Sequence, residues 1–254
     1  MNLPSTSDAI GLLQFEEYVD EFVDGFMTTM GLYIFALVMG LGLGLLIAIA
    51  RQYGGGISSR IATGYVEVIR GTPLLSQVFI IWFLPPAINT GLVSMGYPPL
   101  EYLWQIRIPD FWGGTSIFLS TRILAGAIAL GLNSAAYQAE YFRGSMGSIS
   151  GGQLLAAQSI GMSKSQSIRH IILPQSLRRV IPAWSNEAAY LPKYTTVVSF
   201  IGVEELFLTS SWVVGRTFRS LQVYAIIAII FLILIALVSF ALDKLYEKVK
   251  IPGV

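Results

Sequence analysis

The chain lacks most of the side chains on which reactive sites are built. Its 254 residues include no cysteine and a single histidine, His170. The absence of cysteine excludes disulfide bonds, thiolate zinc sites and thiol catalysis. No acidic cluster accompanies His170 in the sequence, so no metal site is predicted. Charged residues make up 12% of the chain, about half the share of a soluble domain, which excludes an ordinary soluble fold.

Two further patterns are missing. No P-loop of the form G-x-x-x-x-G-K-[ST] occurs, so ATP is expected to bind on another chain and no cofactor is predicted here. The apolar segments carry no Ser/His, Asp/Asp or metal constellation, so no catalytic residue is predicted and an intramembrane enzyme is disfavoured. The chain does not begin with the basic region of a secretory signal. Acidic residues precede the first apolar run instead: Asp8, Glu16, Glu17, Asp20, Glu21 and Asp24.

Long apolar segments make up much of the chain. It is 54% hydrophobic, with a mean hydropathy of +0.65, and a spanning helix needs roughly 20 apolar residues. Five such segments can be placed, at about 26–50, 72–88, 117–139, 180–201 and 223–242. The sequence therefore predicts an all-α, polytopic membrane protein with about five transmembrane helices, forming one domain over residues 1–254. No nucleic-acid partner is expected.

Basic residues predict how the chain lies in the lipid bilayer. The interval 141–179 is rich in arginine and lysine and has no acid after Arg143, and the C-terminal tail is also basic. Such segments stay in the cytoplasm. We therefore expect the N-terminal segment 1–25 and the loop 91–116 outside, and the C-terminus inside. Arg216 and Arg219, on the expected outer side, weaken the asymmetry.

The cytoplasmic interval 141–179 contains start and stop signals for two short helices. Residues 153–160 can form the first helix, and Gly161 suits the left-handed position that ends it. Ser163 and Gln166 have the spacing of a capping box that opens the second helix. Pro174 is expected to terminate that helix. The result would be a compact helix–turn–helix at the membrane surface.

Two interpretations of this interval follow from spacing alone. A short rigid helix could press into a groove on another protein, with Ala156 and Ala157 allowing close approach. An ordinary amphipathic loop at the membrane interface would show the same pattern.

The ordered motifs favour the first interpretation. The interval reads Leu155-Ala156-Ala157, then Gly161, then Ile171-Ile172-Leu173-Pro174. It resembles the cytoplasmic loop by which ABC importer permeases dock onto their ATPases. Further stretches resemble the polar amino acid uptake family of these permeases, namely EVIRGTPLL at 67–75, AYQAEYFRG at 136–144, SFI at 199–201 with EL at 205–206, and RTFR at 216–219.

The resemblance implies the fold and the partners. The fold would be that of a type I ABC importer permease in the cell membrane, paired with a second permease subunit, identical or homologous. Two cytoplasmic ATPase copies would hold ATP and magnesium, and an external solute-binding protein would deliver a polar amino acid. The docking residues would be Leu155, Ala156, Ala157, Gly161, Ile171, Leu173 and Pro174. Leu155 stands where the family usually has Glu, and Tyr194 where it usually has Asp.

The fourth apolar segment carries the candidate substrate pathway. Asn186 and Lys193 are seven residues apart and share a helix face, while Glu187 points to a neighbouring face. Charge at membrane depth is costly and often functional, and such groups could hold the carboxylate and ammonium of a solute. Two alternatives stay open for Glu187, namely lining a pathway and pairing within the protein. A carboxylate at depth also keeps an ion-gradient-driven secondary transporter as the alternative function.

Overall fold

The computed structural model describes residues 16–98, 106–109, 115–119, 121–149 and 151–250, and these residues are helical apart from one small hairpin. The elements are η1 (Glu16–Tyr18), α2 (Val19–Tyr53), α3 (Gly56–Gly71), α4 (Leu74–Ser94), β1 (Ile106–Pro109), β2 (Thr115–Leu119), α5 (Thr121–Gly147), α6 (Gly151–Ser159), α7 (Lys164–Ser167), the π-helical turn η2 (Ile168–Ile172), α8 (Leu173–Arg179), α9 (Ile181–Tyr194), the 3₁₀ segment η3 (Thr195–Ile201), α10 (Leu206–Thr217) and α11 (Ser220–Val249).

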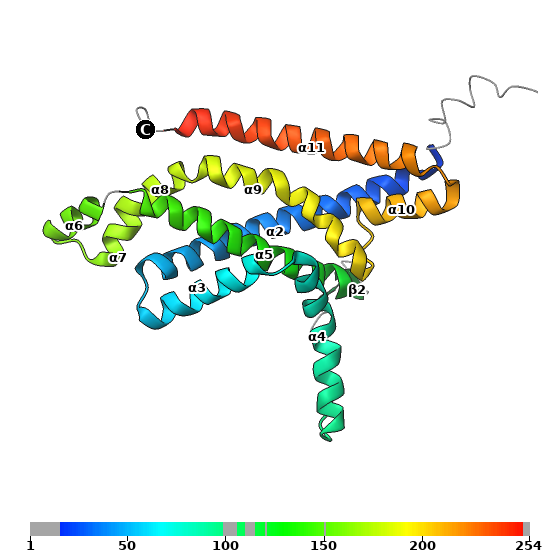
Figure 1. Cartoon of the computed structure of the whole chain (residues 1–254), viewed down its shortest axis with the longest axis horizontal. Coiled ribbons are helices and arrows are strands. Elements are labelled where there is room, and N and C mark those ends of the chain that lie inside the picture. Colours follow the sequence, from blue (N-terminus) through cyan, green and yellow to red (C-terminus); the bar gives the residue numbers. More distant parts are fainter. Residues whose placement is uncertain (1–15, 99–105, 110–114, 120, 150, 251–254) are drawn as a thin grey trace, which may run out of the picture.

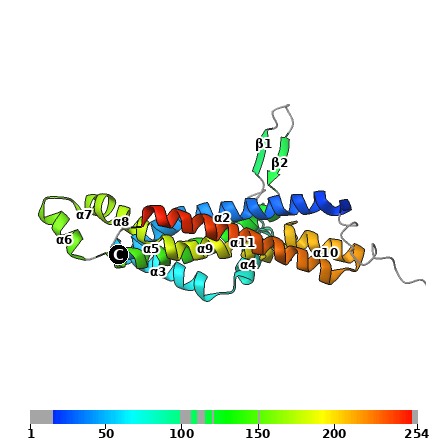
Figure 2. The same ribbon diagram turned by 90° about the horizontal axis from the view of Figure 1, so that it is seen from above.

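The long helices lie side by side and give the molecule two distinct ends. Figure 1 shows α2, α5, α9 and α11 running along one axis, with α6 and α7 at one end and α10 at the other. The last turn of α11 lies at the α6–α7 end, and the first turn of α2 lies at the α10 end. Helix α4 projects away from this bundle in Figure 1, and the β1–β2 hairpin projects from it in Figure 2. The termini of the described chain are therefore at opposite ends of the bundle.

Helices α2 and α5 form the centre of the bundle, and small residues allow their close approach. A Cβ atom on Gly40 would lie 2.2 Å from Gln138 Nε2, and one on Gly44 would lie 3.0 Å from the carbonyl oxygen of Ala135. No atom lies within 4 Å of the same position on Gly42. Gly40 and Gly44 of α2 thus face α5. Small residues at such positions allow the backbones of two membrane helices to approach closely.

The described helices include three that are long and apolar enough to cross a membrane: α2, α4 and α11. A fourth span is possible if two consecutive segments, Ile181–Ile201 and Leu206–Thr217, cross the membrane together. The axes of these two segments differ by 58°. Helix α5, which covers most of the third predicted span, has 27 residues and is the most enclosed of the long helices. The predicted all-α membrane fold is confirmed, and the number of five spans stays a prediction.

Two boundaries differ from the sequence prediction. The segment between the first two predicted spans forms helix α3, which buries Ala62 and Val66. The third apolar segment does not begin as a helix at 117, because residues 115–119 pair as strand β2 with β1. The predicted outer loop 91–116 therefore contains the end of α4 and most of this hairpin, while its residues 99–105 and 110–114 lie outside the described residues.

Candidate functional site

The turn between α6 and α7 has the geometry that the sequence predicts. Gly161 adopts a φ of +92°, which an L side chain rarely tolerates. The Met162 amide donates to the Ala157 carbonyl at 3.1 Å, and the Gly161 amide donates to the Gln158 carbonyl at 3.0 Å. These two bonds form a Schellman motif, which satisfies the carbonyls left open at the end of a helix. The glycine is therefore required by the backbone at this turn.

The second short helix begins as predicted but does not end at Pro174. Ser163 Oγ accepts from the Gln166 amide, and Gln166 Oε1 accepts from the Ser163 amide, so the capping box is present. The expectation that Pro174 terminates the helix is wrong. The chain passes through the π turn η2, in which the Leu173 amide bonds to the Ile168 carbonyl, and continues as α8 to Arg179. Pro174 sits in the first turn of α8, where a missing amide costs little.

The predicted docking residues divide into an exposed and an inward-facing set. Leu155 is 66% exposed, and Ala156 and Gly161 are exposed beside it. Ala157 is buried, and Ile171 and Leu173 pack against an apolar cluster that joins the loop to the bundle. Pro174 is exposed on α8.

The exposed set has a further member that the sequence motif did not indicate, because its position lies between motif residues. Ile160 is 81% exposed, immediately before the glycine turn. We call Leu155, Ala156, Ile160 and Gly161 the docking surface, after the role that the resemblance implies for this loop.

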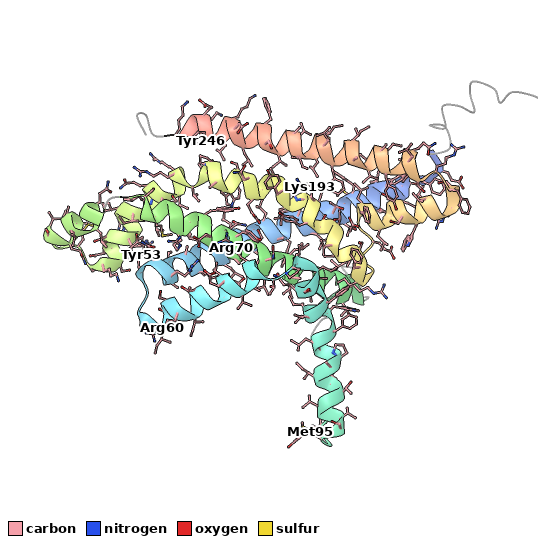
Figure 3. The ribbon with its side chains drawn as sticks, in the orientation of Figure 1. Tyr53, Arg60, Arg70, Met95, Lys193 and Tyr246 are labelled. Atoms are coloured by element: carbon pink, nitrogen blue, oxygen red, sulfur yellow. The ribbon has the colours of Figure 1, made fainter. Side chains whose placement is uncertain are left out.

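Polar side chains fasten the loop to the long helices. Lys164 Nζ donates to the Tyr53 carbonyl at 2.8 Å, at the end of α2, and Ser145 Oγ of α5 donates to the Ser176 carbonyl at 2.6 Å. Arg179 Nη1 donates to the Ser148 carbonyl at 3.0 Å. Figure 3 places Tyr53 where α2 meets the loop. The docking surface is therefore connected to α2 and α5 rather than suspended from a flexible linker.

A charge cluster joins α2, α3 and α5 close to this end of the bundle. Glu140 accepts from Arg51 Nη1 at 2.6 Å and from Arg143 one turn further along α5, and Arg70 lies 3.9 Å away. Arg51 also pairs with Glu67 at 3.6 Å. The bonds from Arg143 and Arg51 lower the pKa of Glu140 to about 2, against the opposing effect of burial. Glu140 and Arg143 lie three residues apart on one helix face, whereas the other three members come from α2 and α3, and no local spacing in the sequence indicates them.

The candidate pathway residues of α9 lie on two different faces. Asn186 and Lys193 are exposed, together with Tyr190 and Tyr194. Lys193 Nζ lies 4.2 Å from the centre of the Tyr190 ring, and Figure 3 shows Lys193 near the middle of the bundle's length. Glu187 is only 3% exposed and faces the interior. The structure thus brings Asn186 and Lys193 onto one face and separates Glu187 from them.

Glu187 belongs to a buried polar network that connects three helices. Ser134 Oγ of α5 donates to Glu187 Oε1 at 2.9 Å. Gln138 Nε2 donates to Ser134 Oγ at 3.0 Å and to the Leu37 carbonyl of α2 at 3.2 Å, while Gln138 Oε1 accepts from Trp184 Nε1 of α9 at 2.7 Å. Each of these groups is satisfied by protein partners, as buried polar groups generally are. The network holds α9 against α2 and α5.

Comparison with known proteins gives this arrangement a family. Over 230 residues the chain is 33% identical to the glutamine transport system permease protein GlnP of Escherichia coli K12, covering 90% of this chain and 93% of the relative. It is 32% identical over 213 residues to the nopaline transport system permease protein NocM of Agrobacterium fabrum, covering 84% of this chain and 80% of that one.

Solved structures show the same fold. A crystal structure of an amino acid ABC transporter with histidines contains a chain 29% identical to this one, with a TM-score of 0.72, covering 98% of this chain and 100% of that chain. A chain of the inward-facing MetNI methionine ABC transporter matches with a TM-score of 0.68 at 19% identity, covering 93% of this chain and 99% of that one, and shows the fold alone. Residues 40–250 match the family model of the binding-protein-dependent transport system inner membrane component. The chain therefore belongs to this family of ABC importer permeases.

Proposed function

We propose that this chain is the membrane subunit of an ATP-driven importer of polar amino acids, working as a pair with an identical or homologous subunit. The relatives support the substrate class, since one is a glutamine permease and another a nopaline permease. An external solute-binding protein delivers the amino acid. Two ATPase subunits bind and hydrolyse ATP with magnesium on the cytoplasmic side.

The docking surface is the observation that carries the proposal. It presents Leu155 and Ile160, at 66% and 81% exposure, beside the Gly161 turn. These apolar side chains lie at the end of the bundle, in a polar loop, where exposed apolar patches commonly mark a protein interface. A groove on each ATPase would cover this surface. Because the ATPases are cytoplasmic, the loop 141–179 that they cover is cytoplasmic, and so is the C-terminus. The segment 1–25 and the loop 91–116 are external.

The fastening of the loop explains how ATP would drive transport. Closure of the two ATPases displaces the docking surface. The bond from Lys164 to Tyr53 passes that displacement to α2, and the bond between Ser145 and Ser176 passes it to α5. Because the Gln138 network joins α2, α5 and α9, the three helices move as one body. The two subunits then alternate between an outward-open and an inward-open state.

The exposed face of α9 is the part of the pathway that we assign to the substrate. Asn186 and Lys193 supply polar groups there, and the Lys193 ammonium can hold a solute carboxylate. Lys193 has an aromatic neighbour, Tyr190, and no carboxylate partner among the described residues, so its charge is available. Glu187 holds helices together from the other face of α9.

The test is co-purification of this chain with the ATPase subunits of amino acid importers. The variant Gly161→Asp puts a charged side chain at a φ of +92° in the docking surface. The matched control Gly56→Asp makes the same chemical change at the first residue of α3, where no atom lies within 4 Å of the new Cβ. We expect wild type and Gly56→Asp to retain the ATPase and Gly161→Asp to lose it. Equal retention by all three proteins would overturn the assignment of the docking surface.

A further inference from the structure

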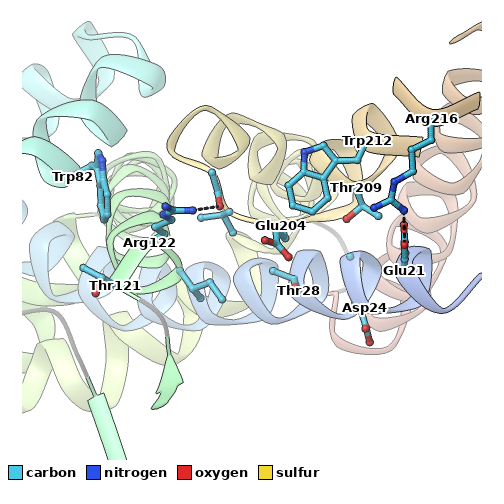
Figure 4. Close-up of a pocket in the computed structure, with 14 residues that line it drawn as sticks. Glu21, Asp24, Thr28, Trp82, Thr121, Arg122, Glu204, Thr209, Trp212 and Arg216 are labelled. Atoms are coloured by element: carbon cyan, nitrogen blue, oxygen red, sulfur yellow. Dashed lines mark hydrogen bonds and ion pairs between the residues drawn. The ribbon is translucent and has the colours of Figure 1, made fainter. Parts of the chain in front are cut away.

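A cavity lined by charged and aromatic side chains lies at the end of the bundle away from the docking surface. It has a volume of about 750 Å³, within the range of roughly 300–1,000 Å³ typical of small-molecule sites. Its walls come from five parts of the chain: the first turns of α2, Trp82 of α4, the first turn of α5, the Gly202–Glu204 turn, and α10. We call it the outer cavity, and Figure 4 shows its lining.

The outer cavity has fixed walls. Glu205 is fully buried and caps α10, accepting from the Phe207 and Leu208 amides at 3.0 and 2.8 Å. Thr29 Oγ1 of α2 accepts from the Leu206 amide at 3.1 Å. A Cβ on Gly25 would lie 2.7 Å from Thr209 Oγ1, so α2 and α10 touch here. Since α2 also carries the loop fastening at its other end, the cavity wall moves with α2.

Charges of both signs face the outer cavity, and only some of them are paired. Arg216 Nη1 bonds to Glu21 Oε1 at 2.7 Å. Arg122 makes one long hydrogen bond, from Nη1 to the Gly202 carbonyl at 3.4 Å, among the described residues. Glu204 is exposed in the cavity and forms no ion pair with any described cation. Asp24 also lines the cavity and forms no ion pair with any described cation. One guanidinium and two carboxylates thus remain free to bind opposite charges on a ligand, and Glu204 is the carboxylate that lies between Arg122 and Trp212 (Figure 4).

Aromatic side chains complete the chemistry of the site. Trp82 stands beside Arg122 at one side of the cavity, and Trp212 lines the other side near Thr209 (Figure 4). Trp212 is 44% exposed, with its ring available to apolar or cationic groups. A cavity with an unpaired cation, unpaired carboxylates and two indole rings fits a small zwitterion with an organic side chain.

We propose that the outer cavity binds a free α-amino acid, with Arg122 holding its carboxylate, Glu204 its ammonium group, and Trp212 contacting its side chain. This is a second recognition site, separated from the exposed face of α9. Because both charged contacts go to the main-chain groups, the site accepts amino acids with different side chains. This proposal rests on the proposed function only for the class of solute. The amino acid would bind in the outer cavity before it enters the pathway.

The experiment measures binding without turnover. The complex of this chain with its ATPases, in lipid nanodiscs without ATP or binding protein, is titrated with radiolabelled L-glutamine and L-arginine by equilibrium dialysis. We expect saturable binding of both, weakened roughly tenfold or more in Arg122→Gln and in Glu204→Gln, since each loses a charged hydrogen bond. Arg60→Gln, an exposed arginine of α3 far from the cavity (Figure 3), is the matched control and should bind as wild type.

Two more arms identify the groups that are recognised. Analogues of glutamine that lack either the α-amino or the α-carboxylate group should not bind. Glutamine should change the tryptophan fluorescence of wild type, and Trp212→Phe should abolish most of that change while circular dichroism remains as in wild type.

Three results would overturn the proposal: no saturable binding to wild type, wild-type affinity in both Arg122→Gln and Glu204→Gln, or binding that is lost in Lys193→Gln and kept in Arg122→Gln. None of these results concerns ATP-driven uptake, which is measured separately and decides the proposed function.

Discussion

Replacing Gly40 by alanine tests the central packing of the bundle most sharply. The new methyl group would lie 2.2 Å from Gln138 Nε2 and 2.8 Å from Ser134 Oγ. Overpacking a closely packed interior costs about 1–3 kcal/mol. Displacing Gln138 also breaks its bonds to Ser134 and Leu37, and a buried polar group left without a partner costs about 1–3 kcal/mol more. We expect a loss of about 2–6 kcal/mol in the free energy of unfolding.

The same helix supplies the control. Gly42 has no atom within 4 Å of its Cβ position, and alanine is favoured over glycine inside a helix by roughly 0.5–1 kcal/mol. Gly42→Ala should therefore be neutral or stabilising.

Thermal unfolding in detergent, followed by circular dichroism, compares the two variants. For a chain of this size roughly 2–4 °C corresponds to each kcal/mol, so Gly40→Ala should unfold at least about 4 °C below wild type and Gly42→Ala should not. Equal midpoints for the two variants would refute the assigned α2–α5 interface.

Three further predictions concern the charged residues. Lys164→Met should leave ATPase binding intact but lower transport several-fold per ATP hydrolysed, measured in vesicles against Lys248→Met in the C-terminal turn of α11; unchanged coupling would show that the bond to α2 carries no motion. Glu140 has a lowered pKa of about 2, so its stabilising contribution is complete above its usual pKa near 4.5 and is lost as pH falls toward 2. Glu140→Gln should be less stable than wild type at pH 7 and lose less stability on acidification, and parallel pH profiles of the unfolding midpoint would contradict this. Lys193→Gln should raise the KM for uptake roughly tenfold or more with ATPase binding unchanged, and a wild-type KM would remove Lys193 from the pathway.

Local signals in the sequence were sufficient to predict the docking loop. The left-handed turn at Gly161 and the Ser163–Gln166 capping box depend on residues within five positions of each other, so spacing alone predicts them. Local signals do not predict that the helix continues past Pro174. The π turn before Pro174 belongs to a longer helix that packs on the bundle. The long apolar runs of α2 and α11 were equally plain.

Features that depend on contacts between distant parts of the chain could not be predicted from the sequence. Helix α3 carries Arg60, Glu67 and Arg70 and is amphipathic, so hydropathy does not mark it, although Val66 is buried against α5. The sequence does not decide the orientation of Glu187, because a helical wheel gives the face of a residue but not the neighbour that covers that face. The outer cavity is formed by four regions far apart in the chain, namely α2, α4, α5 and the 202–217 segment, and no local motif indicates it.

We assign separate functions to the two ends of the bundle. The docking surface at one end and the outer cavity at the other are joined by α2, whose last turn bonds to Lys164 and whose first turns line the cavity. Between them, the exposed face of α9 presents Asn186 and Lys193. A displacement at the docking surface therefore reaches both places where an amino acid would be held.

The measurement that tests this account most directly is amino acid uptake into vesicles that contain this chain with its partner permease, its ATPases and its binding protein. We predict uptake of a polar amino acid that requires enclosed ATP and the binding protein, continues when ion gradients are dissipated, and is lost in Gly161→Asp. Uptake that proceeds without ATP and collapses with the ion gradient would contradict the account and identify an ion-gradient-driven transporter.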